Sequence, residues 1–234
     1  RFVHTPGSAV DAGTLGVDTL LAADYVKLGW NGVVTASGFG PDDVLAALGT
    51  QDGNTIDVAT TAPDAIAIGL TSPLGSHVPL RSTTIANYEV LGLAGDATIN
   101  VAAPINVSGT VRGTGGEPSS GSDRLNLLGA GGSDEDVEIA PDSLDSGDQI
   151  VTGYGAPIGV SGMELISFAG NFDLGDLLTV NLGPGDNNAR VEGGNGVDLV
   201  TSDSLPTIEL AGMSNLLMLA GGGSDVVTFK TGSL

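Results

Sequence analysis

The chain has no cysteine, which excludes disulfide bonds, thiolate metal sites and cysteine nucleophiles. Basic residues are scarce as well: 7 lysines and arginines against 28 aspartates and glutamates give a formal net charge of −21. Neutralising phosphates requires a basic face, so we expect no nucleic-acid partner. The same charge disfavours anionic membrane surfaces. No run of about 18 apolar residues is present, so we expect no membrane span.

Aromatic residues make up only 4% of the chain, and Trp30 is the sole tryptophan. We expect Trp30 to be a partly buried core residue, because tryptophan is highly buried on average. The motifs H-E-x-x-H, G-x-S-x-G and the P-loop are absent. Acidic runs such as Asp42–Asp43 and Asp134–Asp136 could act on a polysaccharide, but charge runs are more typical of solvated turns. We therefore expect no enzyme activity.

Glycine is abundant, with 38 residues, and it stands with Asp and Asn between short apolar runs. Runs of four to six residues rich in Val, Ile, Leu and Thr are typical of strands. At this glycine density we expect helix in less than about 15% of residues. Two stretches, Asp18–Leu28 and Pro41–Leu48, fit a short helix or a strand edge equally well. The runs predict strands near residues 97–101, 125–128, 164–168, 177–182, 198–201, 207–210, 215–219 and 225–229.

Three blocks of the sequence resemble one another, each with the order strand, Gly/Asp turn, strand: Tyr88–Val101, Met163–Val180 and Met213–Thr228. A weaker fourth block starts at Tyr25, and the spacing between blocks is irregular. Units of this kind cannot bury their apolar faces alone and usually stack into solenoids. We predict an all-β fold, a β-solenoid or β-helix-like stack of short strands with Gly/Asp turns. Tandem β-sandwich domains are the alternative.

A polar connection divides the chain into two predicted lobes. Residues 1–112 form an N-terminal β lobe and residues 124–234 a C-terminal β lobe with repeat-like turns. Residues 113–123, rich in Gly and Ser, form a linker or loop between them.

Several turns have a spacing that suits a cation. Gly193–Thr201 fits G-G-x-G-x-D-x-U-x, where U is large and apolar, and Ala220–Thr228 fits all but the first Gly. Glycines allow positive φ and inward-pointing carbonyl oxygens, and the Asp adds a carboxylate. These are hard oxygen ligands that suit Ca²⁺. The alternative is that Gly-x-Asp only forms a tight β-turn. The predicted metal ligands are Asp198, Asp225, Asp42 and Asp123.

These turns resemble the calcium-binding nonapeptide repeats (RTX-like, hemolysin-type) of secreted bacterial proteins. The strand, Gly-Asp turn and Thr/Val strand order is also similar to repeat modules of giant bacterial surface proteins. The resemblance implies an extracellular or cell-surface location and an adhesive or structural role with bound Ca²⁺. The chain departs from these repeats in its long inserts and in lacking consecutive nonapeptides.

Three hypotheses of function follow. The first is a Ca²⁺-stabilised structural or adhesive module, which joins copies of itself or neighbouring domains of a longer chain into a filament or surface layer. The second is a β-helix protein that acts on or binds polysaccharide. The third is a salt-adapted acidic secreted domain without specific ion binding. Arg1–His4 reads as a strand, and neither end carries a capping helix, so we expect open strand edges at both ends.

Overall fold

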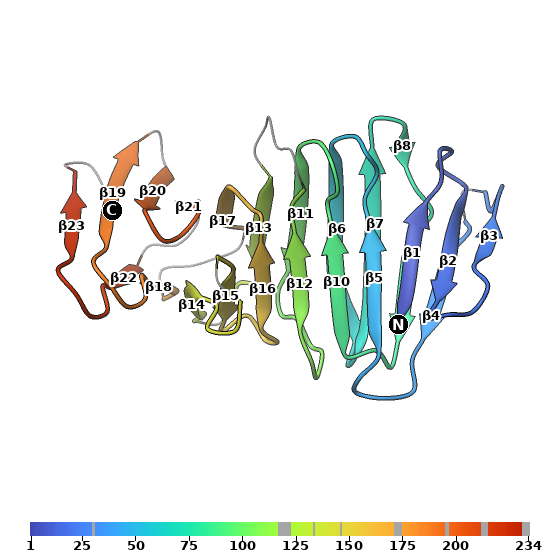
Figure 1. Ribbon diagram of the computed structural model, residues 1–234, viewed down its shortest axis with the longest axis horizontal. Helices are drawn as coiled ribbons and strands as arrows, with labels where there is room; N and C mark the ends of the chain where they lie inside the picture. The colour runs from blue at the N-terminus through green and yellow to red at the C-terminus, as the bar shows by residue number, and fades with distance from the viewer. Residues whose placement is uncertain are drawn as a thin grey trace.

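The structure is a computed structural model, which describes residues 1–29, 31–116, 123–132, 134–145, 147–170, 175–194, 197–211 and 215–230. These residues form two mixed β-sheets and no helix, so the all-β prediction is confirmed (Figure 1). Consequently none of the described elements is a helix that could cross a bilayer.

The first sheet, called sheet A, contains eleven strands. Their spatial order is β22 (Asn215–Leu219), β18 (Leu177–Asn181), β14 (Asp136–Pro141), β15 (Gln149–Thr152), β16 (Ile158–Ser161), β12 (Val111–Thr114), β10 (Asn87–Leu91), β5 (Val44–Leu48), β1 (Phe2–Pro6), β2 (Gly13–Val17) and β3 (Ala23–Tyr25).

The second sheet, called sheet B, contains twelve strands. Their order is β23 (Val226–Phe229), β19 (Asn188–Gly194), β20 (Val197–Ser202), β21 (Thr207–Leu210), β17 (Leu165–Gly170), β13 (Arg124–Gly129), β11 (Ala97–Ala102), β6 (Asn54–Ala62), β7 (Ala65–Ser72), β9 (Leu80–Thr83) and β4 (Val34–Ser37), with β8 (Gly75–Ser76) paired to β7.

The chain passes repeatedly from sheet A to sheet B. Such a pair of strands is called a layer here when both of its strands pair in parallel with the strands of another layer. The layers are β5–β6, β10–β11, β12–β13, β16–β17, β18–β19 and β22–β23. Where layers are neighbours, their strands pair in parallel in both sheets. Antiparallel strands are inserted between layers or beside the first one. The result is an elongated stack along which both sheets run (Figure 1).

Alternation along the strands places one apolar row of each sheet in the space between the sheets. In sheet B, Ile56, Ile99, Leu125 and Ile166 lie in register, each no more than 1% exposed. The matching row of sheet A is Leu45, Tyr88, Val111 and Ile158. Because a slip of one residue would turn a whole row outward, these rows fix the register of the layers.

All eight predicted strands are present, within one or two residues of their expected ends. The two ambiguous stretches contain strands β3 and β5, so neither becomes a helix. Arg1–His4 leads into β1 as expected, but β1 pairs with β2 on one side and β5 on the other, so the expected open edge of this strand is wrong. The first and third sequence blocks are the layers β10–β11 and β22–β23. The middle block is β17–β18, which passes from sheet B to sheet A and is therefore not a layer. Trp30 lies outside the described residues.

Both sheets continue across the predicted linker 113–123. Strand β11 pairs with β13, and β12 pairs with β16, so residues on either side of the connection share each sheet. One apolar cluster likewise contains residues from both predicted lobes. Residues 117–122 of the connection lie outside the described part of the chain.

Three arginines on the outer faces each reach over one strand to a carboxylate on the far side. The outward residue of the crossed strand is small in every case, and Ala46 and Ser167 are buried although they face outward. The ion pairs are Arg1–Glu89 over β5, Arg112–Asp148 over β16 and Arg124–Glu209 over β17. In a chain of charge −21, three of the few cations thus connect strands that are two positions apart in a sheet, and in each pair one strand is inserted and the other belongs to a layer.

Candidate functional site

The turn between β18 and β19 and the turn between β22 and β23 together form a cage of oxygen atoms. The Asn187 side-chain nitrogen, Nδ2, lies 2.9–3.3 Å from the carbonyl oxygens of Gly183, Gly185 and Ala220 and from Asp225 Oδ1. An amide has two N–H donors, so four oxygens share two hydrogens. Carbonyl and carboxylate oxygens gathered in this way are the ligands that Ca²⁺ prefers. Here the Asn187 amide, 4% exposed, stands at the centre of the cage.

Two glycines make the cage possible. Gly221 and Gly223 have φ of 80° and 137°, a region that side chains other than glycine rarely adopt. A Cβ atom at Gly221 would overlap the carbonyl oxygen of Gly183, and one at Gly223 would overlap that of Gly185. The two stacked turns therefore approach closely enough to share the same oxygens.

A second turn repeats this arrangement before β6. Asn54 Nδ2 donates to the carbonyl oxygens of Thr50, Asp52 and Gly92, the last from the next layer. Relative to Asn54 the first two are four and two residues back, as Gly183 and Gly185 are relative to Asn187. Both asparagines are nearly fully buried. An asparagine amide thus closes the turn in two layers far apart in the stack.

Other turns are closed with the opposite polarity. The Asp123 carboxylate, 0% exposed, accepts the backbone N–H groups of Ala97 and Gly116, both at 2.7 Å. Asp176, also 0% exposed, accepts the N–H of Glu135. In these turns backbone N–H groups point inward, and a buried carboxylate accepts their hydrogen bonds. These bonds offset the cost of burying the charge, which would be large for an isolated carboxylate.

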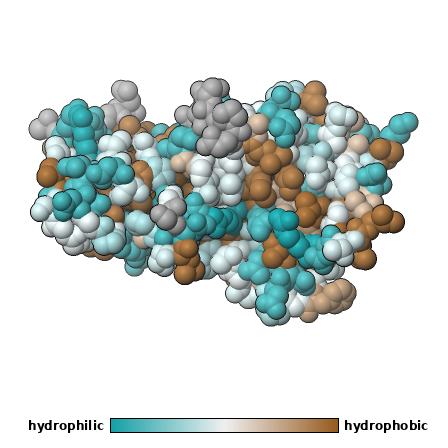
Figure 2. All heavy atoms as spheres, in the orientation of Figure 1, coloured by the Kyte–Doolittle hydropathy of each residue, from teal (hydrophilic) through white to brown (hydrophobic). Residues whose placement is uncertain are grey.

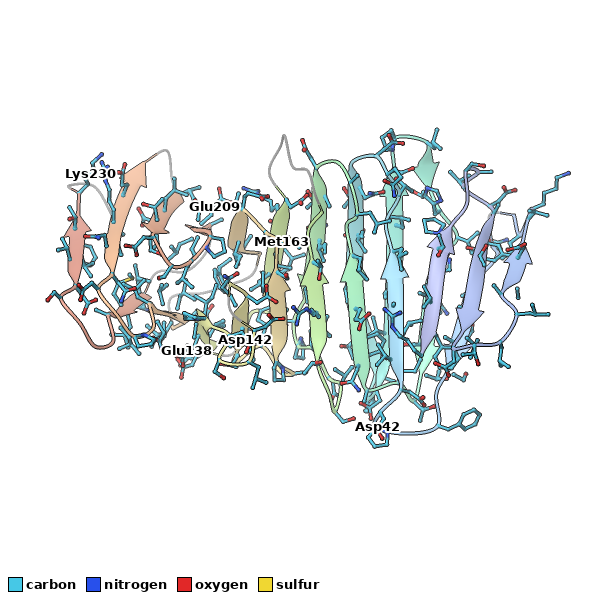
Figure 3. All side chains as sticks on the ribbon, in the orientation of Figure 1. Asp42, Glu138, Asp142, Met163, Glu209 and Lys230 are labelled. Carbon is cyan, nitrogen blue, oxygen red and sulfur yellow. The ribbon has the colours of Figure 1, made fainter. Side chains whose placement is uncertain are left out.

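The four predicted metal ligands lie in different settings. Asp123 and Asp225 are engaged in the turns just described. Asp42 is exposed on the loop before β5 (Figure 3), and Asp198 lies within β20, opposite Gly193 of β19. Among the described residues, no three or more His, Asp or Glu side chains gather as a metal site would require. Calcium binding at these residues stays a prediction.

The stretch Gly193–Thr201, which fits the nonapeptide pattern best, forms part of an antiparallel hairpin, β19–β20. Val200 packs into the core at 1% exposure, as expected of the large apolar position. Residues 195–196, between these two strands, lie outside the described residues.

Sequence reasoning missed Asn54, Asn187 and Asp43. The backbone N–H groups of Phe39 and Gly40 donate to Asp43, and these hydrogen bonds lower the pKa of its carboxyl group. The neighbouring Asp42 makes no such contact in the described part of the chain. A usable signal for the asparagines is a Gly-rich turn that ends in Asn directly before or at the start of a strand, as at Asn187 and Asn54.

The two histidines lie near each other at the other end of the stack. His4 Nε2 is 2.7 Å from the Tyr25 hydroxyl, and the two rings stack. His77 Nε2 is 2.9 Å from the Ser72 hydroxyl, and its Nδ1 is buried with no hydrogen-bond partner among the described residues. Burial, together with the nearby His77, lowers the pKa of His4 to about 4, and burial lowers that of His77. Both rings are therefore neutral in the folded protein at pH 7.

The outer face of sheet B carries a shallow groove of about 270 Å³ near the β23 edge. Asn188, Arg190, Thr201 and Thr228 are among the side chains that line it, and Arg190 is ion-paired with Glu192. These are polar groups that hydrogen-bond readily. Polysaccharide binding stays a prediction, since no described residue adds an aromatic ring to this groove.

No protein-family model matches the chain, and no curated protein or solved structure matches it either. The resemblance to nonapeptide-repeat proteins therefore stays a prediction.

The cage around Asn187 predicts a switch in ion dependence. In Asn187→Asp a carboxylate replaces the amide, the surrounding carbonyls lose their donor, and the free energy of unfolding should fall by about 1–3 kcal/mol. Millimolar Ca²⁺ should restore the melting temperature, because it can bind the carbonyl and carboxylate oxygens then gathered in the cage. NaCl of equal ionic strength should not. Thermal melts in both salts check this.

Asn31→Asp is the control, since it adds the same charge at an exposed position away from the cage. Its melting temperature should respond similarly to the two salts. If Asn187→Asp and Asn31→Asp respond equally to Ca²⁺, the cage does not accept a cation.

The buried His4 predicts acid sensitivity. The unfolded chain binds a proton near pH 6.5 and the folded chain only near pH 4, so the unfolded state is favoured as pH falls between these values. Stability is full above pH 6.5 and should drop by about 3 kcal/mol towards pH 4 through this residue. Denaturant unfolding of His4→Phe from pH 7 to pH 4 should show a shallower slope than the parent chain. Thr5→Val, on the same strand but exposed, should keep the parent slope, and equal slopes in all three would contradict the assignment.

Proposed function

We propose that the chain is a structural module, a two-sheet β-solenoid that forms part of an extracellular or cell-surface protein. The observation that carries the proposal is the in-register stacking of layers, with parallel pairing of equivalent strands in both sheets. Each layer adds inward apolar side chains to the rows of both sheets, and its connecting turn hydrogen-bonds to the turn of a neighbouring layer. Such a stack supplies length and stiffness, which is what a structural module contributes.

The closed turns support the same proposal. Hydrogen bonds that join neighbouring turns connect residues 38, 26 and 41 positions apart in the sequence. The inserted loops therefore vary in length while the stacking contact is kept. A protein whose role depends on its layered body tolerates such variation between layers.

The extracellular location is supported by the sequence resemblance and by the acidic composition, which keeps a protein soluble. A surface location predicts that protease added to intact source cells degrades the chain while a cytosolic marker enzyme stays intact. Degradation only after lysis would contradict the location and leave the structural proposal unaffected.

The structural proposal predicts that one layer can be removed from the stack. Asn100 and Asn126 occupy equivalent positions 26 residues apart, so deletion of residues 101–126 should give a folded chain with one layer fewer. Far-UV circular dichroism should remain β-type. Small-angle X-ray scattering should show a stack shorter by about 5 Å, one strand spacing. Some loss of stability is expected, because the apolar core becomes smaller.

Deletion of residues 101–125 is the matched control. It removes one residue fewer, so Asn126 takes the inward position of Val101 and Leu127 turns outward. This variant should unfold or aggregate. If both deletions behave alike, the layers are not interchangeable units and the solenoid proposal fails.

A further inference from the structure

The two ends of the stack expose apolar side chains. At one end lie β3 and β4, where Figure 2 shows hydrophobic residues gathered; at the other lie β22 and β23. Most of the exposed large hydrophobic residues in the described part of the chain belong to these ends: Leu20, Leu21, Val26, Leu28 and Val33 at the first, and Leu217, Leu219, Val226 and Phe229 at the second.

In the last layer, β22–β23, the inward side chains are more exposed than their partners in the preceding layer. Phe229 of β23 is 59% exposed, whereas Val191, its partner in β19, is 0% exposed. Leu216 and Met218 of β22 are likewise only partly buried, although their partners in β18 are fully buried. A further layer on this end would bury these side chains. In the described part of the chain β22 and β23 are the outermost strands of their sheets, and an edge strand can pair with another chain.

Strand direction at the two ends is compatible. In sheet A, β3 runs in the same direction as β22, because the antiparallel steps between them come in pairs. In sheet B, β4 runs in the same direction as β23 for the same reason. A second copy placed end to end therefore continues both sheets at once with parallel pairing, as β22 and β23 already pair with β18 and β19.

The connections at the two ends also match. The segment after β3 leads from sheet A to sheet B, as the turn 220–225 does after β22. Lys27 lies in the first connection and forms no ion pair among the described residues. The second connection, residues 220–225, carries Asp225, and its Ser224 N–H donates to the Asp186 carboxylate in the neighbouring turn. End-to-end placement brings the lysine to the side of the stack that holds these carboxylates.

We propose that the β22–β23 end of one chain binds the β3–β4 end of a second copy, which extends both sheets head to tail. The proposal rests on the structural function inferred above and names its partner. The contact is heterologous, so it leaves one end of each kind open after every addition and gives a growing polymer. A two-fold contact between like ends would instead pair β22 with its copy in antiparallel fashion, unlike its pairing with β18, and would stop at a dimer.

Blocking each end separately tests the contact. The first variant carries Leu219→Lys and Phe229→Lys, and the second carries Leu21→Lys and Val26→Lys, since lysine on an edge opposes strand pairing. All four positions are exposed, so folding should persist, which circular dichroism checks. Leu144→Lys with Leu199→Lys is the control, with the same charge change at exposed sites on the loop before β15 and on the inserted strand β20, away from both ends.

Sedimentation velocity over a range of concentrations at physiological ionic strength gives the readout. The parent chain and the control should form a series of oligomers that lengthens with concentration. Each end-blocked variant alone should be monomeric. An equimolar mixture of the two should form a dimer that grows no further, because only one complementary pair of ends remains.

Two results would overturn the proposal. A parent chain that stays monomeric at all concentrations excludes the contact. An end-blocked variant that still dimerises by itself shows a two-fold contact between like ends. In either case the solenoid could still accept removal of residues 101–126, so failure of the contact is distinct from failure of the structural function.

Discussion

The structure depends on closing each turn against the turn of the next layer. Strands satisfy their backbone groups in the sheets, but the connections between sheets A and B have no such ladder, and a buried carbonyl or N–H without a partner costs about 1–3 kcal/mol. Asn187 and Asn54 supply donors to inward carbonyls, and Asp123 supplies an acceptor to inward N–H groups. With the turns held one strand spacing apart, the apolar rows lie in register and the core can pack.

The sign of the inward backbone groups decides which side chain can close a turn. Inward carbonyls create a negative site, which an amide N–H₂ or a cation satisfies; inward N–H groups create a positive site, which a carboxylate satisfies. Asp225 and Asp123 share the Gly/Asp pattern in sequence, and both accept backbone N–H groups. Only Asp225 also accepts a side-chain amide, that of Asn187, and this amide donates to the carbonyls of the turn as well. A pattern of glycines and aspartates therefore does not by itself specify a cation site.

This explains how much the sequence could predict. Short apolar runs between glycines located the strands, because alternation and strand propensity act locally. The partner of each strand depends on the stack as a whole, so Met163–Val180 resembled the other blocks while running from sheet B to sheet A. Likewise the choice of Asp43 over Asp42 for the turn depends on which carboxylate meets the N–H groups of Phe39 and Gly40, and spacing alone does not contain that geometry.

The inserted strands show a rule that bears on growth of the stack. Each insertion adds two antiparallel steps: β1–β2–β3 and β16–β15–β14 in sheet A, and β6–β7–β9 and β21–β20–β19 in sheet B. A single step would reverse the strand direction for every later layer in that sheet, and the turn linking the sheets would then begin on the opposite side. Two steps restore the direction. The stack thus lengthens through irregular insertions while each end keeps the polarity that a further layer needs.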